Sequence, residues 1–173
     1  HAGGYGVHIK SNSAGSPVIS NVMVVDTYGG FWIEGSDNIN AYNVVYFQQT
    51  PTSNPNATYG VRFTGGSSQI NFIGGRIDSA EINSATILRY GVMIEAADGL
   101  TFAGFSIRAN VGVQIDGTSG GTIGSVFFSN NVIDTCRTSC VTITGVGSAA
   151  FMSNLKFTGN HIVSGLLPTS IPF

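Results

Sequence analysis

Three carboxylates recur at one position of a repeated phrase in this sequence, and their spacing suits the cleavage of glycosidic bonds. They are Glu34, Glu95 and Asp116. Glycosidases cleave with two carboxyl groups, about 5 to 5.5 Å apart in retaining enzymes and about 6.5 to 9.5 Å apart in inverting ones. If the copies stack as strands about 4.8 Å apart, Glu95 and Asp116 form a close pair. Glu34 and Glu95, two copies apart at about 9.6 Å, then lie near the inverting distance.

We therefore predict that Glu95, Asp116 and Glu34 are catalytic. Two carboxylates this close repel each other, so one should hold its proton to a higher pH than the other and act as the general acid. The alternative interpretation is that these carboxylates are solvated side chains on the outer face of a strand.

A neighbouring outward position carries side chains that can bind sugars. Trp32, Arg62 and Gln114 share this position, and Tyr59 and Tyr90 each precede the glycine of their copy. Sugars pack on aromatic rings and accept hydrogen bonds from amide and guanidinium groups. We predict that these five residues bind substrate. Two alternatives stay open: Trp32 packs against a loop or a second subunit, and Arg62 balances Glu34 one strand away.

The repeated phrase is Gly-Val-x-Ile, with small departures. Its copies start at residues 6, 30, 60, 91, 112 and 140, so the gaps are 24, 30, 31, 21 and 28 residues. Self-similarity with a period in this range is typical of solenoids. The copies are Gly6–Ile9, Gly30–Ile33, Gly60–Phe63, Gly91–Ile94, Gly112–Ile115 and Cys140–Ile143.

Short apolar runs and polar turns follow each copy. Leu100-Thr101-Phe102 is one such run, and Ala97-Asp98-Gly99 is one such turn. No segment has a helical period of 3.6 residues. We predict an all-β, single-stranded parallel β-helix of about six coils over residues 1–165, with 166–173 as a C-terminal cap or a contact with another subunit. A β-sandwich is the alternative, but it does not explain why the phrase returns six times.

Alternation along the strands predicts which residues form the core. Asp78, Arg108 and Asp134 each follow a later apolar position and should form a structural ladder of alternating charge. The expected core residues of the first strands are Val7, Ile9, Ile33, Val61, Phe63, Val92, Ile94, Val113, Ile115, Val141 and Ile143.

Composition narrows the classes of partner. Charged residues make up 9% of the chain and the formal net charge is −2, which argues against a nucleic-acid partner. No apolar run approaches the roughly 18 residues of a membrane span, so we expect no membrane insertion. We expect no cofactor and no metal site.

Cys136 and Cys140 are either two thiols at a corner of the coil, the preferred interpretation, or a small-loop disulfide of an extracellular protein.

Two long insertions precede glycines of the phrase, between Gln48 and Tyr59 and between Asp78 and Tyr90. Insertions in repeat folds often collect on the binding face, although tolerated surface loops are an equal alternative. Asn56 begins a glycosylation sequon. Because the first residue is His1, we expect the chain to be part of a longer protein.

The phrases Tyr-Gly-Val-x-Ile, Asn131-Val132-Ile133 and Phe157-Thr158-Gly159-Asn160-His161-Ile162 resemble the pectate-lyase-like right-handed parallel β-helix superfamily. The Gly-, Ser- and Asn-rich texture is most similar to phage tailspikes and related polysaccharide depolymerases. This resemblance implies binding, and often cleavage, of polysaccharides, and side-by-side homotrimers. No motif of the calcium-dependent pectate lyases or of the polygalacturonases carries over to this chain.

The leading hypothesis is a tailspike-like domain on a virion tail that binds a bacterial capsule or lipopolysaccharide O-antigen. Glycoside hydrolysis is its expected reaction, and lyase chemistry is the second choice. Two other hypotheses stay open: a non-enzymatic structural or adhesin segment of a viral fibre, and a secreted bacterial polysaccharide lyase. Only Arg62 and the Tyr59 and Tyr90 ladder offer groups that a lyase needs.

Overall fold

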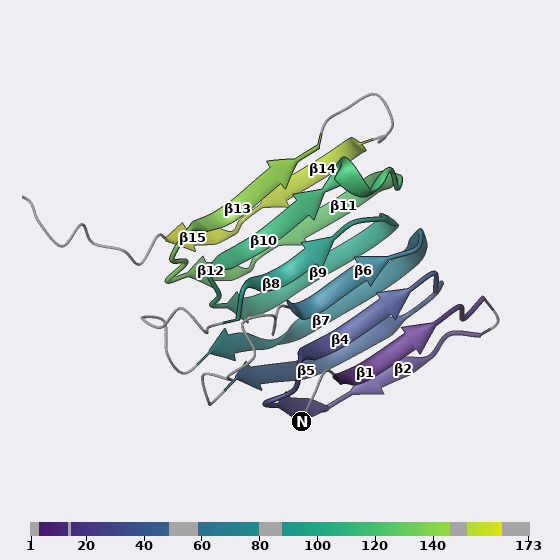
Figure 1. Ribbon diagram of the computed structural model, residues 1–173, viewed down its shortest axis with the longest axis horizontal. Coiled ribbons are helices and arrows are strands. Elements are labelled where there is room, and N and C mark those ends of the chain that lie inside the picture. The colour runs from purple at the N-terminus through teal and green to yellow at the C-terminus, as the bar shows by residue number, and fades with distance from the viewer. Residues whose placement is uncertain (1–3, 14, 49–58, 80–87, 146–151, 164–173) are drawn as a thin grey trace, which may run out of the picture.

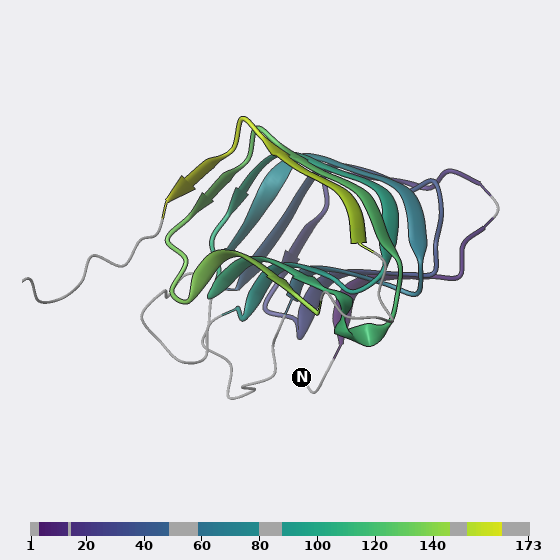
Figure 2. The same ribbon diagram turned by 90° about the horizontal axis from the view of Figure 1, so that it is seen from above.

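The computed structural model describes residues 4–13, 15–48, 59–79, 88–145 and 152–163, which form a parallel β-solenoid (Figure 1). The glycosylation sequon at Asn56, most of both long insertions and the proposed cap 166–173 lie outside the described residues. Figure 2 shows the successive coils superposed, with the two sheets on opposite sides of the coil interior. The predicted all-β parallel fold is confirmed.

The first sheet is built from the copies of the repeated phrase. Val61, Val92 and Val113 pair in register on adjacent strands. Equivalent residues of successive copies are therefore direct neighbours, as the repeat predicted. In spatial order, the strands are β1 (Tyr5–Lys10), β4 (Gly29–Glu34), β6 (Tyr59–Thr64), β8 (Tyr90–Ile94), β10 (Val111–Asp116) and β13 (Ser139–Thr144).

The second sheet closes each coil. Residues with left-handed φ bend its strands at one recurring position, as at Asn43 and Gly74. The main strands are β2 (Val18–Ser20), β5 (Asn40–Gln48), β7 (Ser67–Ser79), β9 (Ala97–Ile107), β11 (Ile123–Ser129) and β14 (Met152–Thr158). Beyond the bend lie the short strands β3 (Met23–Val25), β12 (Val132–Asp134) and β15 (His161–Val163).

One short 3-10 helix, η1 (Gly117–Ser119), interrupts the strands. Within the described ranges, no helix has the length and apolar character needed to cross a membrane.

The solenoid has about four turns, so the prediction of about six coils was slightly high. Six strands do stack in the first sheet, but β1 and β13 have a neighbour on one side only. These two strands also account for the errors in the predicted core. Val7, Ile9 and Val141 are only partly buried, and Ile143 is 46% exposed, because among the described residues each lies on an end strand with one neighbour.

The central coils contain the predicted core. Ile33, Val61, Phe63, Val92, Ile94, Val113 and Ile115 are fully buried. The second sheet adds a ladder of phenylalanine rings, in which Phe72, Phe102 and Phe128 stack at centroid distances of 5.6 Å and 5.4 Å. Stacked identical rings bury apolar area without disturbing the register of the strands.

The glycine of the phrase is needed for close packing. A Cβ on Gly91 would lie 2.5 Å from Cγ2 of Ile107, and a Cβ on Gly112 would lie equally close to Cγ2 of Ile133. Ile107 and Ile133 occupy the third apolar position of their coils, after the two strand runs. This position therefore fills the space that a side chain at the glycine would need. In the last coil Cys140 occupies the position of the glycine, and the corresponding Ile162 is exposed.

Cys136 and Cys140 form a disulfide, so the preferred interpretation of two free thiols was wrong.

The alternating charge ladder is confirmed. Nε of Arg108 lies 3.5 Å from Oδ1 of Asp78 and 3.8 Å from Oδ1 of Asp134, and Arg76 also pairs with Asp78. Since Asp78 is almost fully buried, this ladder is a structural element of the coil corner.

Candidate functional site

The candidate site lies where the strands of the first sheet end and the chain turns toward the second sheet. The β6–β7 and β8–β9 turns contain only two residues each, 65–66 and 95–96. The β10–β11 turn, residues 117–122, is longer and contains η1. This difference in turn length leaves one protruding turn beside two short ones.

The protruding turn is held by its own polar contacts. Asp116 caps η1, because its Oδ1 accepts hydrogen bonds from N of Thr118 at 2.9 Å and from its Oγ1 at 2.6 Å. Gly120 ends η1 in the left-handed conformation. Oγ of Ser119 donates to the backbone oxygen of Glu95 at 2.9 Å, which fastens the turn to the neighbouring coil.

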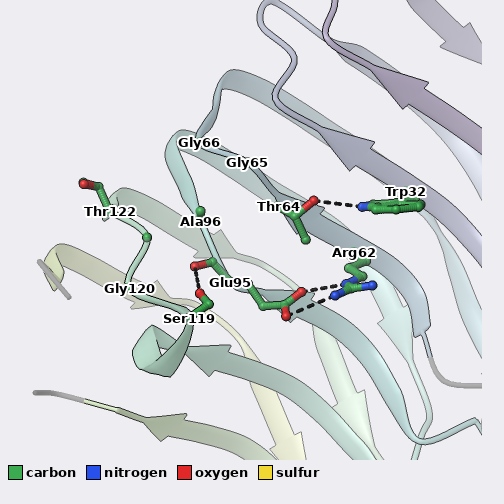
Figure 3. A pocket seen from close by; sticks show the side chains of 11 residues that line it. Trp32, Arg62, Thr64, Gly65, Gly66, Glu95, Ala96, Ser119, Gly120 and Thr122 are labelled. Carbon is green, nitrogen blue, oxygen red and sulfur yellow. Dashed lines mark hydrogen bonds and ion pairs between the residues drawn. The ribbon is translucent and has the colours of Figure 1, made fainter. Parts of the chain in front are cut away.

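A cleft of about 540 Å³ lies between this turn and the shorter ones. Figure 3 shows Arg62 and Glu95 pointing toward each other at its centre, with Trp32 at one end and the 117–122 turn at the other. The cleft is lined by Trp32, Arg62, Thr64, Gly65, Gly66, Glu95, Ala96, Ser119, Gly120, Gly121 and Thr122.

Arg62 and Glu95 form a bidentate ion pair. Nε of Arg62 donates to Oε2 of Glu95 at 2.6 Å, and Nη2 donates to Oε1 at 3.1 Å. Burial would lower the pKa of Arg62, but the hydrogen bonds that its guanidinium donates to Glu95 and to the hydroxyl of Tyr5 raise it above its ordinary value. The structure thus pairs Arg62 with Glu95, and the proposed balance between Arg62 and Glu34 is not observed.

Glu34 has other partners. Its carboxylate lies 3.0 Å from Nε2 of His8 and 3.2 Å from Nζ of Lys10. Burial would raise the pKa of Glu34, but the hydrogen bonds from His8 and Lys10 lower it. Glu34 does not line the cleft, so the structure brings Glu95, but not Glu34, into the candidate site.

Trp32 packs against charged and aromatic neighbours along the stack. Its ring lies parallel to that of His8 at a centroid distance of 4.0 Å, and the guanidinium of Arg62 lies 5.4 Å from its centroid. These neighbours come from the strands on either side, since His8 and Arg62 are its register partners on β1 and β6. The indole Nε1 donates to Oγ1 of Thr64 at 2.9 Å. Trp32 therefore meets the cleft beside Thr64 while its ring packs on His8 and Arg62.

The same packing continues to Tyr59 and Tyr90. The guanidinium of Arg62 lies 4.8 Å from the ring of Tyr59, which stacks on Tyr90 at 5.6 Å, and Arg89 lies 5.1 Å from the ring of Tyr90. We call His8, Trp32, Arg62, Tyr59, Tyr90 and Arg89 the cation–aromatic column. Burial raises the pKa of Tyr59, which favours its protonated, hydrogen-bonding form. The predicted binding residues Trp32, Arg62, Tyr59 and Tyr90 are thus connected, although Tyr59 and Tyr90 do not line the cleft.

Asp116 lies beside the cleft rather than in its lining. Burial would raise its pKa, but hydrogen bonds from Thr118, from the backbone at Thr118 and from Thr144 hold it below its usual value. The register pairs Ile94 with Ile115, so Glu95 and Asp116 follow two directly paired residues. Their carboxylates nevertheless bond in different directions, that of Glu95 to Arg62 on β6 and that of Asp116 to Thr118 in its own turn and to Thr144 on β13.

Gln114 is only 7% exposed, and its Nε2 donates to Oγ1 of Thr144 at 2.8 Å. Its register neighbour Met93 is buried as well. The outward position that Trp32, Arg62 and Gln114 share on the first sheet is therefore not exposed on every strand. Gln114 lies outside the cleft lining.

The prediction from sequence missed the polar turn residues of the cleft. Thr64, Ser119 and Thr122 contribute hydroxyl groups, and the turns contribute exposed glycine backbone at Gly65, Gly66 and Gly120. The available signal was the extra length of the 117–122 turn. Across the described ranges, no three His, Cys, Asp or Glu side chains gather as a metal site would require.

Comparisons with protein-family models, with curated proteins and with solved structures find no match to this chain.

Proposed function

We propose that this chain is a polysaccharide-binding β-helix domain of the tailspike kind, and that the cleft around Arg62 and Glu95 holds the glycan. The observation that carries the proposal is the composition of the cleft. It combines an indole edge, a charge-neutral ion pair, three hydroxyl groups and exposed glycine backbone in about 540 Å³. Concave sites with a few convergent polar groups are the usual form of small-ligand sites.

The location outside a cell is supported by the disulfide. Structural disulfides persist in extracellular proteins and on virion surfaces and are rare in the cytosol. A bacterial capsule or an O-antigen is the polymer that a virion tail meets there. A protein secreted by a bacterium would meet the same class of polymer.

A homotrimer is the assembly proposed for such a domain. Large apolar side chains are exposed on the second sheet at Val18, Met23 and Tyr42, and neighbouring chains could cover them. Light scattering on the purified protein at micromolar concentration should give a mass three times that of the 18.0 kDa chain.

Hydrolysis is the second part of the proposal, with Asp116 and Glu95 as its two carboxyl groups. The lowered pKa of Asp116 suits the ionised nucleophile or base. The role of general acid then falls to Glu95. Both oxygens of Glu95 accept hydrogen bonds from Arg62, so Glu95 can act as the general acid only after it has taken up a proton from solvent and released Arg62.

A non-enzymatic fibre segment is the competing function, and the cation–aromatic column favours it. The rings of Trp32, Tyr59 and Tyr90 are already packed against His8, Arg62 and one another. A column of this kind stiffens a shaft without any ligand. The two functions differ in whether the hydroxyl groups of Thr64 and Ser119 must contact a glycan, since a shaft would use them only for their internal hydrogen bonds with Trp32 and Glu95.

The deciding experiment measures binding of the protein to immobilised capsule and O-antigen preparations by biolayer interferometry, with release of reducing ends followed in parallel. We expect saturable binding to a subset of the preparations. Thr64→Val and Ser119→Ala should weaken this binding, whereas the matched changes Thr158→Val and Ser129→Ala on the second sheet should not. Equal binding by all four variants would exclude the cleft as the glycan site.

A further inference from the structure

We infer that the cleft selects an uncharged glycan over one that carries carboxylates. This inference rests on the proposed function and adds the class of substrate. It follows from where the cationic groups are, and from how they are already paired.

The first step is the charge of the cleft lining. Among the residues that the structure describes, Arg62 and Glu95 are the only charged side chains of the lining, and they neutralise each other in a bidentate pair. Just outside the lining, Glu34 is paired with Lys10 and His8, while Asp116 is bonded to hydroxyl and backbone groups. A glycan in the cleft therefore meets no uncompensated positive charge, and it lies beside the carboxylate of Asp116.

The second step is the consequence of recruiting Arg62. A uronic acid would have to take the guanidinium from Glu95, whose side chain is only 19% exposed. This exchange would leave Glu95 partly buried and unpaired, which is strongly unfavourable. It would also disturb the contacts of Arg62 with the rings of Trp32 and Tyr59. Arg62 is therefore a poor receptor for an acidic sugar while Glu95 is present.

The third step concerns the other cations. Among the basic side chains that the structure describes, none besides Arg62 lines the cleft. Lys10, at the end of β1, is paired with Glu34. Arg89 precedes β8, at the opposite end of that strand from Glu95, and lies over the ring of Tyr90. Arg76 and Arg108 are bound to Asp78.

The last step is what the cleft does offer. Thr64, Ser119 and Thr122 present hydroxyl groups, and the glycine turns present backbone N–H and C=O groups. Neutral donors and acceptors of this kind match the hydroxyl and acetamido groups of uncharged sugars. The site is thus built to recognise a neutral polymer through hydrogen bonds and limited apolar contact.

The test uses uronic-acid-containing capsule polysaccharides before and after chemical reduction of their carboxyl groups to alcohols. The two forms of each polymer differ in whether a given sugar carries a charged carboxylate or a neutral hydroxymethyl group. Binding is measured by biolayer interferometry for the unchanged protein, for Glu95→Gln and for the control Arg89→Gln. We expect the unchanged protein and Arg89→Gln to bind the reduced form more tightly than the acidic form by at least about tenfold. Binding of the acidic form would take Arg62 away from the partly buried carboxylate of Glu95.

Glu95→Gln is the decisive variant, since it keeps the shape of the side chain and frees Arg62. It should bind the acidic form at least about tenfold more tightly than the unchanged protein does. A preference of the unchanged protein for the acidic form, or an unaltered preference in Glu95→Gln, would overturn the inference. Absence of binding to either form of any polymer would instead overturn the proposed function itself.

Discussion

The imidazole of His8 lies parallel to the indole of Trp32, with an interplanar angle of 2° and ring centroids 4.0 Å apart. The two rings come from register-paired residues on β1 and β4, so the spacing of the strands brings them into contact. Trp32 is therefore a structural link between coils as well as a border of the cleft.

Replacing Trp32 tests this double role. Trp32→Ala removes the contacts with His8 and Arg62, and we expect the free energy of unfolding to fall by about 1–3 kcal/mol. His8→Ala removes the ring contact and the hydrogen bond with Glu34 but keeps the contact of Trp32 with Arg62, and it should cost less. Urea denaturation followed by far-UV circular dichroism measures both changes. A Trp32→Ala protein as stable as the parent would show that the column contributes nothing to the fold.

Ile94→Asp tests the core. Ile94 is fully buried between Phe63 and Ile115 on the neighbouring strands, and a buried unpaired charge costs several kcal/mol. We expect this variant to be unfolded at room temperature. The matched change Ile73→Asp lies on the outer face of β7, where the side chain is 38% exposed, and should leave the protein folded. Thermal melts of both variants make the comparison.

Gly91→Ala tests the close approach between the phrase and the third apolar position. Its methyl group would lie 2.5 Å from Ile107, so the coil corner must open. Overpacking of this kind costs typically about 1–3 kcal/mol. Gly4→Ala, where no atom lies within 4 Å of an added Cβ, serves as the control. If the two variants melt at the same temperature, the recurring glycine has another cause.

The carboxylate variants test catalysis. Glu95→Gln and Asp116→Asn keep the shapes of the side chains, and asparagine remains a good helix cap. If the protein hydrolyses a glycan, each change should lower turnover by a factor of at least about 100. Release of reducing ends from a bound polymer is the measurement, with Glu34→Gln as a test of the alternative, more distant pair. Full activity in both main variants would remove the pair from the mechanism.

The lowered pKa of Asp116 predicts how stability depends on pH. A carboxyl group with a lower pKa in the folded than in the unfolded chain stabilises the fold above its unfolded pKa of about 3.9. This contribution disappears as the pH falls through the lower, folded value. The melting temperature of Asp116→Asn should therefore fall less steeply than that of the parent as the pH drops below about 4. Parallel curves for Asp116→Asn and the parent would contradict the assignment.

The sequence was sufficient to predict the fold because equivalent residues of successive copies define which residues pair on adjacent strands. Val92 and Val113 occupy the same place in two copies of one phrase, and copies of a solenoid repeat stack on each other. The errors lie at the ends, as at Ile143, since a periodic pattern does not reveal where stacking stops. The disulfide between Cys136 and Cys140 depends on local backbone geometry that the spacing of the cysteines leaves open.

The candidate site was harder to predict. The outward position correctly brought Trp32 and Arg62 together, but the partner considered for Arg62 was Glu34, although Glu95 also lies one strand away. The structure resolves this choice, because His8 and Lys10 occupy the carboxylate of Glu34. The cleft itself depends on the path of residues 117–122, and the path of a longer turn does not follow from its length.

Trp32 is the only tryptophan in the chain, and the guanidinium of Arg62 lies 5.4 Å from the centroid of its ring. Indole fluorescence responds to the position of a nearby charge, so any event that moves Arg62 should alter the emission of this single fluorophore. The protein thus carries an optical probe at the border of its own cleft. Titration with a polymer that opens the Arg62–Glu95 pair should shift the emission spectrum without any added label.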